Sequence, residues 1–469
     1  MDKAVESKKE VSEKIKKSLN YSIKDAASAS VMDGITANYT TPYAIAMNAS
    51  NSQIAALTSI PNLLLIASQL ISTKLMQKFP RKKIISSSIL MQAIMLIPIS
   101  ILYLLYSRNM VSFAVTLLLL FFSLYSFFGT VHAPIWNSLI GDLVKRAEKK
   151  HLGKYFGIRN KFASLAALLA TIAAGFILDL SKKANFLFAG FMAIYLIAFT
   201  ARLISKKYID MHYEPIFKEK KGYYFSFVQF VKKAPSNNFG RFVIYVSFMI
   251  LAANIAGPFF SVYMLRDLGF SYLQYMILIS TVTLSTVVWM PIWGRFSDNY
   301  GNIKAVKFCS FIVAALPILW LFSRNFWWVF IIQILSGFSW AGFNLGISNF
   351  VYDTVSRQRR GLCFAYFNIL LGLGVFLGAF VGGGIAKLSI NFLGYGIIPS
   401  IFLISGILRY AVITFFMYRF KEVRKVEDID TIRIINFTMP LHAINPHHAI
   451  WLMPFKNHFV KMKKAVLRT

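Results

Sequence analysis

The sequence predicts an all-α membrane protein with twelve transmembrane helices, arranged as two six-helix bundles related by pseudo-twofold symmetry. Three observations predict this fold class. Hydrophobic residues make up 57% of the 469-residue chain and charged residues 15%, which is too apolar for a soluble protein of this length. Twelve apolar runs are each long enough to cross a hydrocarbon core about 30 Å thick. Several motifs also recur in the same order in both halves of the chain.

The twelve predicted spans are helices, because each is a continuous apolar run of about 20 residues. A membrane β-barrel would instead show segments of about ten residues in which apolar and polar side chains alternate. The spans are predicted near residues 23–47, 54–76, 84–106, 111–140, 155–178, 185–204, 241–264, 272–295, 304–322, 326–351, 361–386 and 394–418.

The spans and the polar segments around them divide the chain into five regions. These are an N-terminal arm (1–22), a six-helix bundle (23–204), a linker (205–240), a second six-helix bundle (241–420) and a tail (421–469). The arm alternates Lys and Glu, which predicts either a disordered segment or a helix lying on the membrane surface. The basic, aromatic linker is expected to be a tether between the bundles or an amphipathic surface helix.

Residues that commonly bind metals or carry out catalysis form no recognisable motif. Cys309 and Cys363 lie near predicted helix ends and imply neither a disulfide framework nor a metal site. The spans contain no nucleophile with a general base, so we expect no enzyme, no metal and no cofactor. The tail holds four of the seven histidines at a spacing that matches no metal motif. They are His442, His447, His448 and His458.

The net charge of +32 is distributed unevenly along the chain. Of the 51 Lys and Arg residues, 44 fall in segments on one side of the predicted membrane and six on the other, while Arg409 lies within the last span. The positive-inside rule then predicts a multi-pass protein of the cell membrane with both termini in the cytoplasm. The basic charge also attracts anionic membrane lipid. Because no basic soluble domain with interleaved aromatic residues exists, we expect no nucleic-acid partner.

The internal repeat consists of matched motifs in the same order in both halves. An Ala-Asn-x-x-x-Pro-aromatic pattern begins at Ala37 and again at Ala253, 216 positions later. The loop at residues 73–83 aligns with residues 294–304 at an offset of 221. In both halves an Asp is then followed by Gly-x-x-Phe-x-x-x-Asn. Repeats that run in the same direction are typical of one class of secondary transporters.

The short polar loop from Gly294 to Lys304 reads Gly-x-x-x-Asp-x-x-Gly-x-x-Lys and joins two apolar runs. Gly294 allows close helix packing, Asp298 offers a carboxylate to a helix N-terminus, and Gly301 permits a tight turn. This loop resembles the signature loop between helices 8 and 9 of the major facilitator superfamily of secondary transporters. The resemblance covers roughly residues 23–420 and identifies no substrate subfamily.

The resemblance implies that helices 1, 4, 7 and 10 line a central cavity between two halves that rock about it. It also implies that the loop holding Asp298 lies against the start of helix 5. We hypothesise that Asp298 caps that helix or pairs with Arg159, which would lock a closed cytoplasmic gate. Asp142 and Asp353, at matching ends of helices 4 and 10, belong to the same predicted gate. The alternative is a loop that needs Gly and Asp only to form its turn.

Asp33 is the one acidic residue that falls deep inside a predicted span. Thr36 and Thr40 follow on the same face of the predicted helix, which indicates a surface that avoids lipid. Such a carboxylate could bind and release a proton as the cavity alternates between wet and dry, or could bind a cationic substrate. The alternative is a structural Asp that is hydrogen-bonded to Thr36 or to a neighbouring helix.

Further polar residues lie on the presumed cavity helices. Asn38 and Asn254 are either cavity residues or partners for backbone groups freed by Pro42 and Pro258. Arg409 lies on helix 12, which the resemblance places outside the cavity, and we expect its side chain to reach toward the cytoplasm. Predicted substrate contacts are His132, Trp136 and Asn137 in helix 4 and Asn344 in helix 10.

These features predict a monomeric secondary transporter that moves a small solute by alternating access, driven by a proton gradient. The alternative is a transporter-like receptor or sensor that binds a ligand without moving it. A substantial folded soluble domain would favour the sensor, but the arm, the linker and the tail are each too short and too charged to form one.

Overall fold

The computed structural model is helical throughout the residues that it describes, and these residues form no strand. The tail histidines, the first residues of the arm and part of the linker lie outside the described residues. The structure describes residues 8–106, 108, 110–147, 152–215, 226–356, 359–388 and 396–426.

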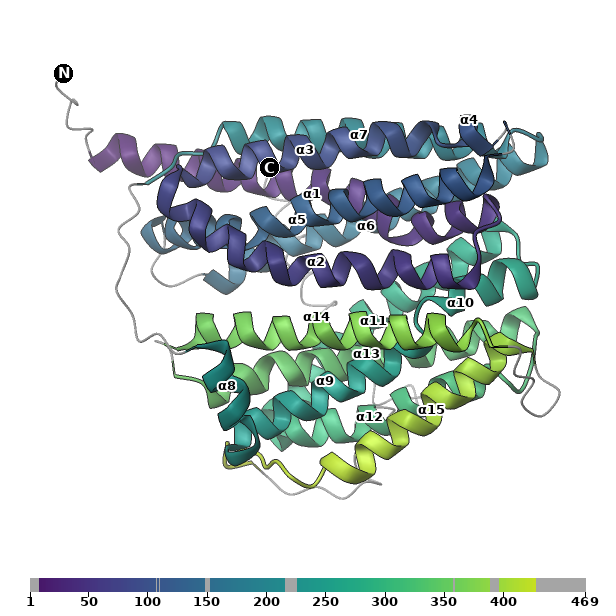
Figure 1. The fold of residues 1–469 in the computed structure, drawn as a ribbon. Helices are drawn as coiled ribbons and strands as arrows, with labels where there is room; N and C mark the ends of the chain where they lie inside the picture. The colour runs from purple at the N-terminus through teal and green to yellow at the C-terminus, as the bar shows by residue number, and fades with distance from the viewer. Residues whose placement is uncertain are drawn as a thin grey trace, which may run out of the picture.

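The N-terminal bundle contains six long helices and one short one, coloured purple to teal in Figure 1. They are α1 (Lys8–Ala46), α2 (Asn51–Lys78), α3 (Arg81–Ile101), α4 (Tyr103–Tyr106), α5 (Val111–Ala147), α6 (Leu152–Lys183) and α7 (Leu187–Asp210). α1 packs against α6 and α7, α3 packs against α5 and α7, and α2 packs against α5. The shared partners close these helices into one bundle.

The C-terminal bundle lies beside the first and is coloured teal to yellow-green. Its elements are α8 (Phe227–Lys233), η1 (Ala234–Ser236), α9 (Asn238–Ala256), α10 (Phe259–Val262), η2 (Tyr263–Asp267), α11 (Tyr272–Tyr300), α12 (Asn302–Leu319), α13 (Phe326–Thr354), α14 (Arg360–Ile385) and α15 (Ile397–Phe416). α9 packs against α14 and α15, α12 against α13 and α15, and α11 against α13. This pattern repeats that of α1, α3 and α2, which confirms the predicted pair of six-helix bundles.

Local capping repeats as well. Ser50 and Gln53 form a capping box at the start of α2, and Ser271 and Gln274 form the same box at the start of α11, 221 positions later. In each box the serine hydroxyl accepts the N–H of the glutamine, and the glutamine side chain accepts the N–H of the serine at 2.9 Å. Each box satisfies N–H groups that the first helical turn would otherwise leave unpaired.

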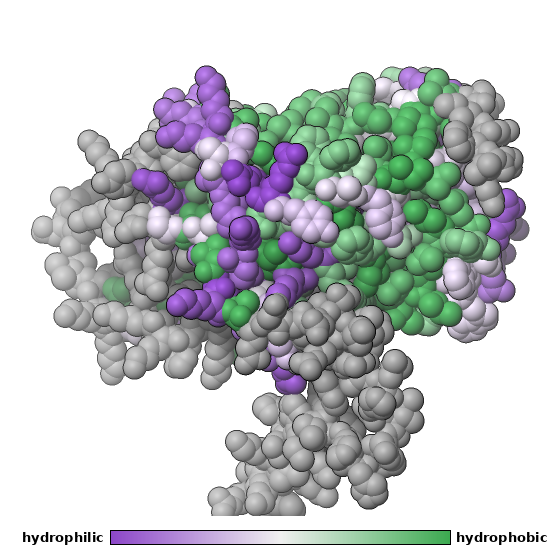
Figure 2. Space-filling model, turned by 90° about the horizontal axis from the view of Figure 1, so that it is seen from below, coloured by the Kyte–Doolittle hydropathy of each residue, from purple (hydrophilic) through white to green (hydrophobic). Residues whose placement is uncertain are grey.

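Lipid-facing surface covers the middle of the molecule. By length and composition, the described helices include ten candidate spans, which match every predicted span except those of the more polar α1 and of α2. Figure 2 shows a broad hydrophobic surface on one face, with hydrophilic residues gathered toward one end and a smaller group at the other. Large apolar side chains such as Leu180, Phe380 and Phe415 are each more than 60% exposed. Such exposure is favourable in lipid and unfavourable in water.

The helix α1 begins inside the predicted arm, at Lys8. Ile15 is only 3% exposed and packs in an apolar cluster with Ile84 and Leu139. The described part of the arm is therefore a continuation of the first helix that packs on the protein. This early start also places Asp25 in the interior of α1 rather than near its end.

Close helix contact in the C-terminal bundle depends on glycine. α14 crosses α9 through Gly374, Gly378 and Gly382, which follow one another every fourth position. A Cβ at any of the three would collide with a backbone carbonyl oxygen of α9. These glycines let two backbones approach, as small residues commonly do in membrane helix pairs.

The apolar core joins the two bundles at one end only. We call the end at which α3, α9 and α12 begin the basic end, and the end at which α2 and α11 begin the far end. Toward the far end, one cluster of buried residues contains members of both bundles, including Tyr43, Tyr195, Phe259 and Tyr275. At the basic end, each bundle has a separate cluster of its own. The molecule is therefore closed at the far end.

Specific contacts hold the far end shut. The Tyr275 hydroxyl donates to the main-chain oxygen of Asn38 at 2.9 Å, which is the carbonyl that Pro42 leaves without its helical donor. Arg266 donates to the Asn51 side chain at 2.6 Å. Both hydrogen bonds link the C-terminal bundle to the N-terminal bundle.

Candidate functional site

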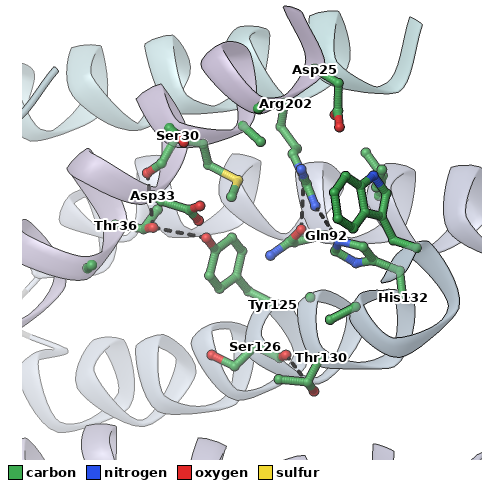
Figure 3. Close-up of a pocket in the computed structure, with 18 of the residues that line it drawn as sticks. Asp25, Ser30, Asp33, Thr36, Gln92, Tyr125, Ser126, Thr130, His132 and Arg202 are labelled. Atoms are coloured by element: carbon green, nitrogen blue, oxygen red, sulfur yellow. Dashed lines mark hydrogen bonds between the residues drawn. The ribbon is translucent and has the colours of Figure 1, made fainter. Parts of the chain in front are cut away.

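A cavity of about 570 Å³ lies inside the N-terminal bundle and is lined by α1, α3, α5, α6 and α7. Figure 3 shows polar side chains of α1, α3, α5 and α7 around this cavity. The polar lining residues are Asp25, Ser30, Asp33, Thr36, Gln92, Tyr125, Ser126, Thr130, His132, Trp136, Asn137, Arg159 and Arg202. Of the predicted substrate and proton residues, Asp33, Thr36, His132, Trp136 and Asn137 are thus in one place.

Asp33 lies in the wall of this cavity, with its side chain exposed to the open space. Thr36 does not satisfy it, because the Thr36 hydroxyl bonds to the Met32 carbonyl oxygen at 3.0 Å and to the Tyr125 hydroxyl at 2.9 Å. The charged groups that act on its carboxylate are Arg202, which attracts it, and Asp25, which repels it. An exposed carboxylate facing a cavity remains available to a proton or a ligand.

Arg202 on α7 is the centre of a buried network that the sequence analysis missed. The side chain is 4% exposed, and its Nε donates to the Gln92 side chain at 2.8 Å. Its other nitrogens bond to the Ser205 hydroxyl at 3.1 Å and to His132 Nε2 at 3.1 Å. Because a guanidinium can only donate, His132 Nε2 is the acceptor, and the imidazole is neutral with its hydrogen on Nδ1. His132 Nδ1 then donates to the Phe128 carbonyl oxygen at 3.2 Å.

Asp25 closes the network from the opposite side. Its carboxylate is 4% exposed and accepts the Ser205 hydroxyl at 2.7 Å, and Ser205 also accepts from Arg202. The prediction that Asp33 is the only deeply placed acid was therefore wrong, since α1 starts earlier than its hydropathy indicates. The result is a continuous chain of hydrogen bonds from Asp25 through Ser205 and Arg202 to His132, joining α1, α7 and α5.

The remaining predicted cavity residues have local roles. Thr40 donates to the Thr36 carbonyl oxygen at 2.7 Å and accepts the Tyr195 hydroxyl at 3.1 Å, and it does not line the cavity. The side-chain amides of Asn38 and Asn254 donate to carbonyl oxygens one turn earlier, at 2.9 and 2.8 Å. These are not the carbonyls freed by the prolines. Asn344 is exposed and lies outside the lining of the cavities in the described part of the chain.

The predicted contact between Asp298 and Arg159 is not formed in this conformation. The Arg159 guanidinium lies over the Trp136 ring, 4.1 Å from its centroid, in the N-terminal cavity. Asp298 is 76% exposed and lies 4.0 Å from Arg424 of its own bundle. The two residues belong to different bundles, and these have separate cores at the basic end.

Asp142 and Asp353 instead tie loops within their own bundles. Arg81 donates to Asp142 at 2.8 Å. In the C-terminal bundle, Asn302 donates to Asp353 at 2.7 Å and the Arg424 guanidinium lies 3.1 Å from the same carboxylate. Each Asp therefore links the end of its helix to the start of the long helix that precedes it in the chain.

The residues of the signature loop differ in how much they are constrained. Gly301 has φ of +96°, a conformation that favours glycine, so its predicted turn role fits the backbone. Gly294, predicted to allow close packing, would bring a Cβ no nearer than 3.9 Å to Leu345, so this position does not require glycine. Lys304 is half-buried on α12.

A second cavity, of about 450 Å³, lies in the C-terminal bundle and is lined by α9, α10, α11, α12, α13 and α15. Arg409 is part of its wall and is 3% exposed. The guanidinium donates to the Val313 carbonyl oxygen at 2.6 Å and to the Ala253 carbonyl oxygen at 3.2 Å. The expectation that Arg409 reaches toward the cytoplasm was wrong, because both acceptors hold it inside the bundle.

The chain resembles known transporters along most of its length. The family model described as Major Facilitator Superfamily matches residues 26–246 and again residues 238–452. Tetracycline resistance protein, class B, of Escherichia coli is 28% identical over 153 residues, which are 32% of this chain and 36% of that protein. Vacuolar basic amino acid transporter 1 of Saccharomyces cerevisiae is 31% identical over 100 residues, which are 21% of this chain and 18% of that protein. The matches thus span roughly a third or less of these curated relatives.

Solved structures share the fold. The crystal structure of the nucleoside transporter NupG superposes with a TM-score of 0.64 at 16% identity, covering 86% of this chain and 99% of that one. At this identity the likeness concerns the arrangement of the helices alone.

Proposed function

Because the chain belongs to the Major Facilitator Superfamily, we propose that it is a secondary active transporter that moves a small solute by alternating access and is driven by protons. The observation that carries the proposal is the N-terminal cavity. It contains a carboxylate open to the cavity, Asp33, beside a buried network of Asp25, Arg202 and His132. Ionisable residues inside membrane spans are costly and are commonly part of ion or proton pathways.

The charge balance of this cavity supports proton coupling. Its acidic and basic lining residues are Asp25, Asp33, Arg159 and Arg202, so the net charge of these four is zero when both carboxylates are ionised. A proton on Asp33 leaves one positive charge in excess inside the bundle. Because a low-dielectric interior screens charge poorly, that excess changes the relative stability of states that expose the cavity differently.

The arrangement of the bundles supports alternating access. One shared core closes the far end, and separate cores at the basic end leave the bundles free to part there. We assign the basic end to the cytoplasm of a cell-membrane protein by the positive-inside rule, so this is a cytoplasm-facing conformation. We retain residues 205–240 as the tether between bundles 23–204 and 241–420.

The gate at the basic end remains part of the proposal. When the bundles close there, we expect Asp298 to leave Arg424 and to approach Arg159 at the start of α6. Arg159 is partly buried and is held over Trp136 by a cation–π contact. Closure of the basic end would replace this contact by an ion pair between Arg159 and Asp298.

Transport by the reconstituted full chain tests the proposal. Proteoliposomes would be given a pH gradient of either sign and assayed for flux of tetracycline, lysine and arginine, which the names of the relatives suggest, and of a panel of small organic solutes. Asp33→Asn is expected to abolish gradient-driven flux, and a protonophore is expected to do the same in the unaltered protein.

Asp179→Asn is the matched control. Asp179 is also an intramembrane acid, 6% exposed, but it pairs with Lys183 at 2.9 Å at the far end of α6, outside the cavity. It should keep its flux. Full gradient-driven flux in Asp33→Asn would contradict the proton role, and specific binding without any flux would indicate the sensor instead.

A further inference from the structure

Arg409 is a buried cation whose hydrogen-bonding capacity is largely unused. A guanidinium has five N–H donors. Two hydrogen bonds are formed, both to main-chain carbonyl oxygens, and Nε is fully buried without a hydrogen-bond partner. Buried polar groups are nearly always satisfied, so an orphaned donor in a cavity wall points to a ligand.

The charge of Arg409 is not balanced by the protein either. Among the described residues that line this cavity, Arg409 is the only one that is ionised, and no described carboxylate lies within ion-pair distance of it. A cation taken out of water without a partner costs several kcal/mol. An anion that entered the cavity would recover part of that cost.

The rest of the cavity wall has the composition of a small-molecule site. Asn254, Gln333 and Ser336 are its polar members, and Trp320 and Trp340 provide aromatic surface. Sites for small organic ligands are mostly apolar walls with a few convergent polar groups that fix orientation. The cavity volume of about 450 Å³ falls in the usual range for such ligands.

We propose that Arg409 binds the carboxylate of the transported solute, while the aromatic wall of the same cavity takes up an apolar part of it. The ligand class is therefore a small organic carboxylate. A single guanidinium matches a carboxylate in charge and in its planar, two-pronged geometry. A phosphate carries about twice that charge and would need further cations, which this lining does not supply. The inference rests on the proposed transport function and names its substrate class.

Binding measurements on the purified full chain test this assignment without requiring transport. The probes are the sodium salts of benzoate, indole-3-acetate and succinate at millimolar concentration, with benzamide, indole-3-acetamide and benzylamine as neutral and cationic counterparts. The readouts are isothermal titration calorimetry and the shift in the thermal unfolding midpoint. We expect at least one carboxylate to bind and its amide or amine counterpart not to.

Variants of Arg409 identify the site. Arg409→Gln should weaken carboxylate binding by about tenfold or more, the loss expected for one charge-assisted hydrogen-bonded pair. Arg409→Lys should weaken carboxylate binding less, because lysine keeps the positive charge and loses only the two-pronged geometry of the guanidinium. Arg419→Gln is the control just beyond the same helix, since Arg419 is exposed and outside the cavity. Size-exclusion profiles and the ligand-free unfolding midpoints show whether each variant is folded.

Three results would overturn the inference: no carboxylate binds, the neutral amides bind equally well, or a folded Arg409→Gln protein keeps full affinity. These outcomes are separate from the transport assay. Carboxylate-selective binding that depends on Arg409 without flux would leave this site standing and remove the transport proposal. Proton-driven flux of neutral or cationic solutes that is unchanged in Arg409→Gln would support the transport proposal and remove this site.

Discussion

Arg202 on α7 and Arg409 on α15 occupy matching places in the two bundles, 207 positions apart. Each reaches the third helix of its own bundle, at Gln92 in one case and at Val313 in the other, and these two are separated by the same 221 positions as the matched loops. Arg202 is surrounded by an amide, a hydroxyl and an imidazole, whereas Arg409 meets only main-chain oxygens. Both bundles therefore have an arginine at this position, but the groups that surround it differ.

The difference indicates that the two repeated bundles have different functional groups in their interiors. In the N-terminal bundle, Asp25 lies one hydroxyl group away from Arg202, and Asp33 faces the same cavity. The position 216 residues after Asp33 is Met249, which is fully buried in an apolar cluster. One bundle therefore holds groups that can exchange protons, and the other holds an unpaired positive charge.

The largest expected effect comes from replacing each arginine by a similarly sized apolar residue. Arg202→Met should destabilise the protein by about 3–5 kcal/mol, because it leaves Asp25 as a buried charge and unpairs Gln92 and His132. Arg409→Met should be neutral or stabilising by about 1 kcal/mol or more, because it removes a buried charge that has no counter-ion. Thermal unfolding in detergent, followed by intrinsic fluorescence, measures both.

Equal losses in the two variants would contradict the comparison, since they would mean that Arg409 is as well satisfied as Arg202. Arg419→Met, at an exposed position beyond α15, controls for the general effect of adding a methionine. It should change the unfolding midpoint by little, as surface substitutions commonly do.

The matched loops at the basic end differ in their backbone. Gly301 begins the turn in the C-terminal bundle with φ of +96°, and a Cβ there would lie 2.7 Å from the Glu422 carboxylate. The equivalent residue of the other bundle is Pro80, with φ of −57°. Gly301→Ala should cost about 1–3 kcal/mol in the free energy of unfolding, because of the strained backbone and the displaced Glu422. Chemical unfolding of the purified protein measures this.

Gly294→Ala is the internal control for that loop. Its Cβ would meet only Leu345, at 3.9 Å, within a regular helix, so the substitution should be neutral or stabilising by up to about 1 kcal/mol. If both alanines behaved alike, the two glycines of the signature loop would have the same role, contrary to their different backbones.

Much of the fold could be predicted because hydropathy and repetition are visible in a single chain. Each of the twelve span ranges overlaps one or more described helices. Asp33, Thr36, His132 and Trp136 do lie together, but in a cavity inside the N-terminal bundle and not in the expected central cavity lined by helices 1, 4, 7 and 10. Their convergence follows from the scaffold, which the repeat reveals. Local patterns were sufficient for the helices, but not for the place of the cavity.

Arg202 and Asp25 were missed for a physical reason. Hydropathy ends a span where charged residues begin, so both were assigned to helix ends, yet α7 continues to Asp210 and α1 begins at Lys8. The matched spacing of Arg202 and Arg409 was a signal that could have found Arg202. The Asp298–Arg159 contact is a different case, because which end of a two-bundle molecule is closed depends on a small free-energy difference between two packings and not on a local motif.

Substitutions at opposite ends of the molecule should shift the equilibrium between its two open conformations in opposite directions. Tyr275→Phe removes the hydrogen bond to Asn38 that crosses the bundles near the far end, worth about 1 kcal/mol, and should favour opening there. Asp298→Asn should leave this conformation intact, because its present ion pair is 4.0 Å long and exposed, but should weaken closure at the basic end. Labelling of single cysteines placed near each end measures the shift.

The smallest effect that we predict is a pH dependence of stability that arises in the N-terminal bundle and not in the C-terminal bundle. His212 is 2% exposed just beyond α7, and burial lowers its pKa below the ordinary value of about 6.5. Just beyond α15, the C-terminal bundle buries an aromatic residue instead, Phe420, which is 1% exposed.

The unfolded chain binds the His212 proton more readily than the folded chain, so stability should fall as the pH drops below about 6.5. Uptake of one proton limits the loss to about 1.4 kcal/mol per pH unit, and near pH 6 the loss is smaller. His212→Phe, which puts a non-titrating aromatic ring at this position, should make the unfolding midpoint less dependent on pH between pH 7 and 5.5. The Phe420→His variant should acquire the same acid sensitivity, and an unchanged pH profile in both would show that this site does not titrate with folding.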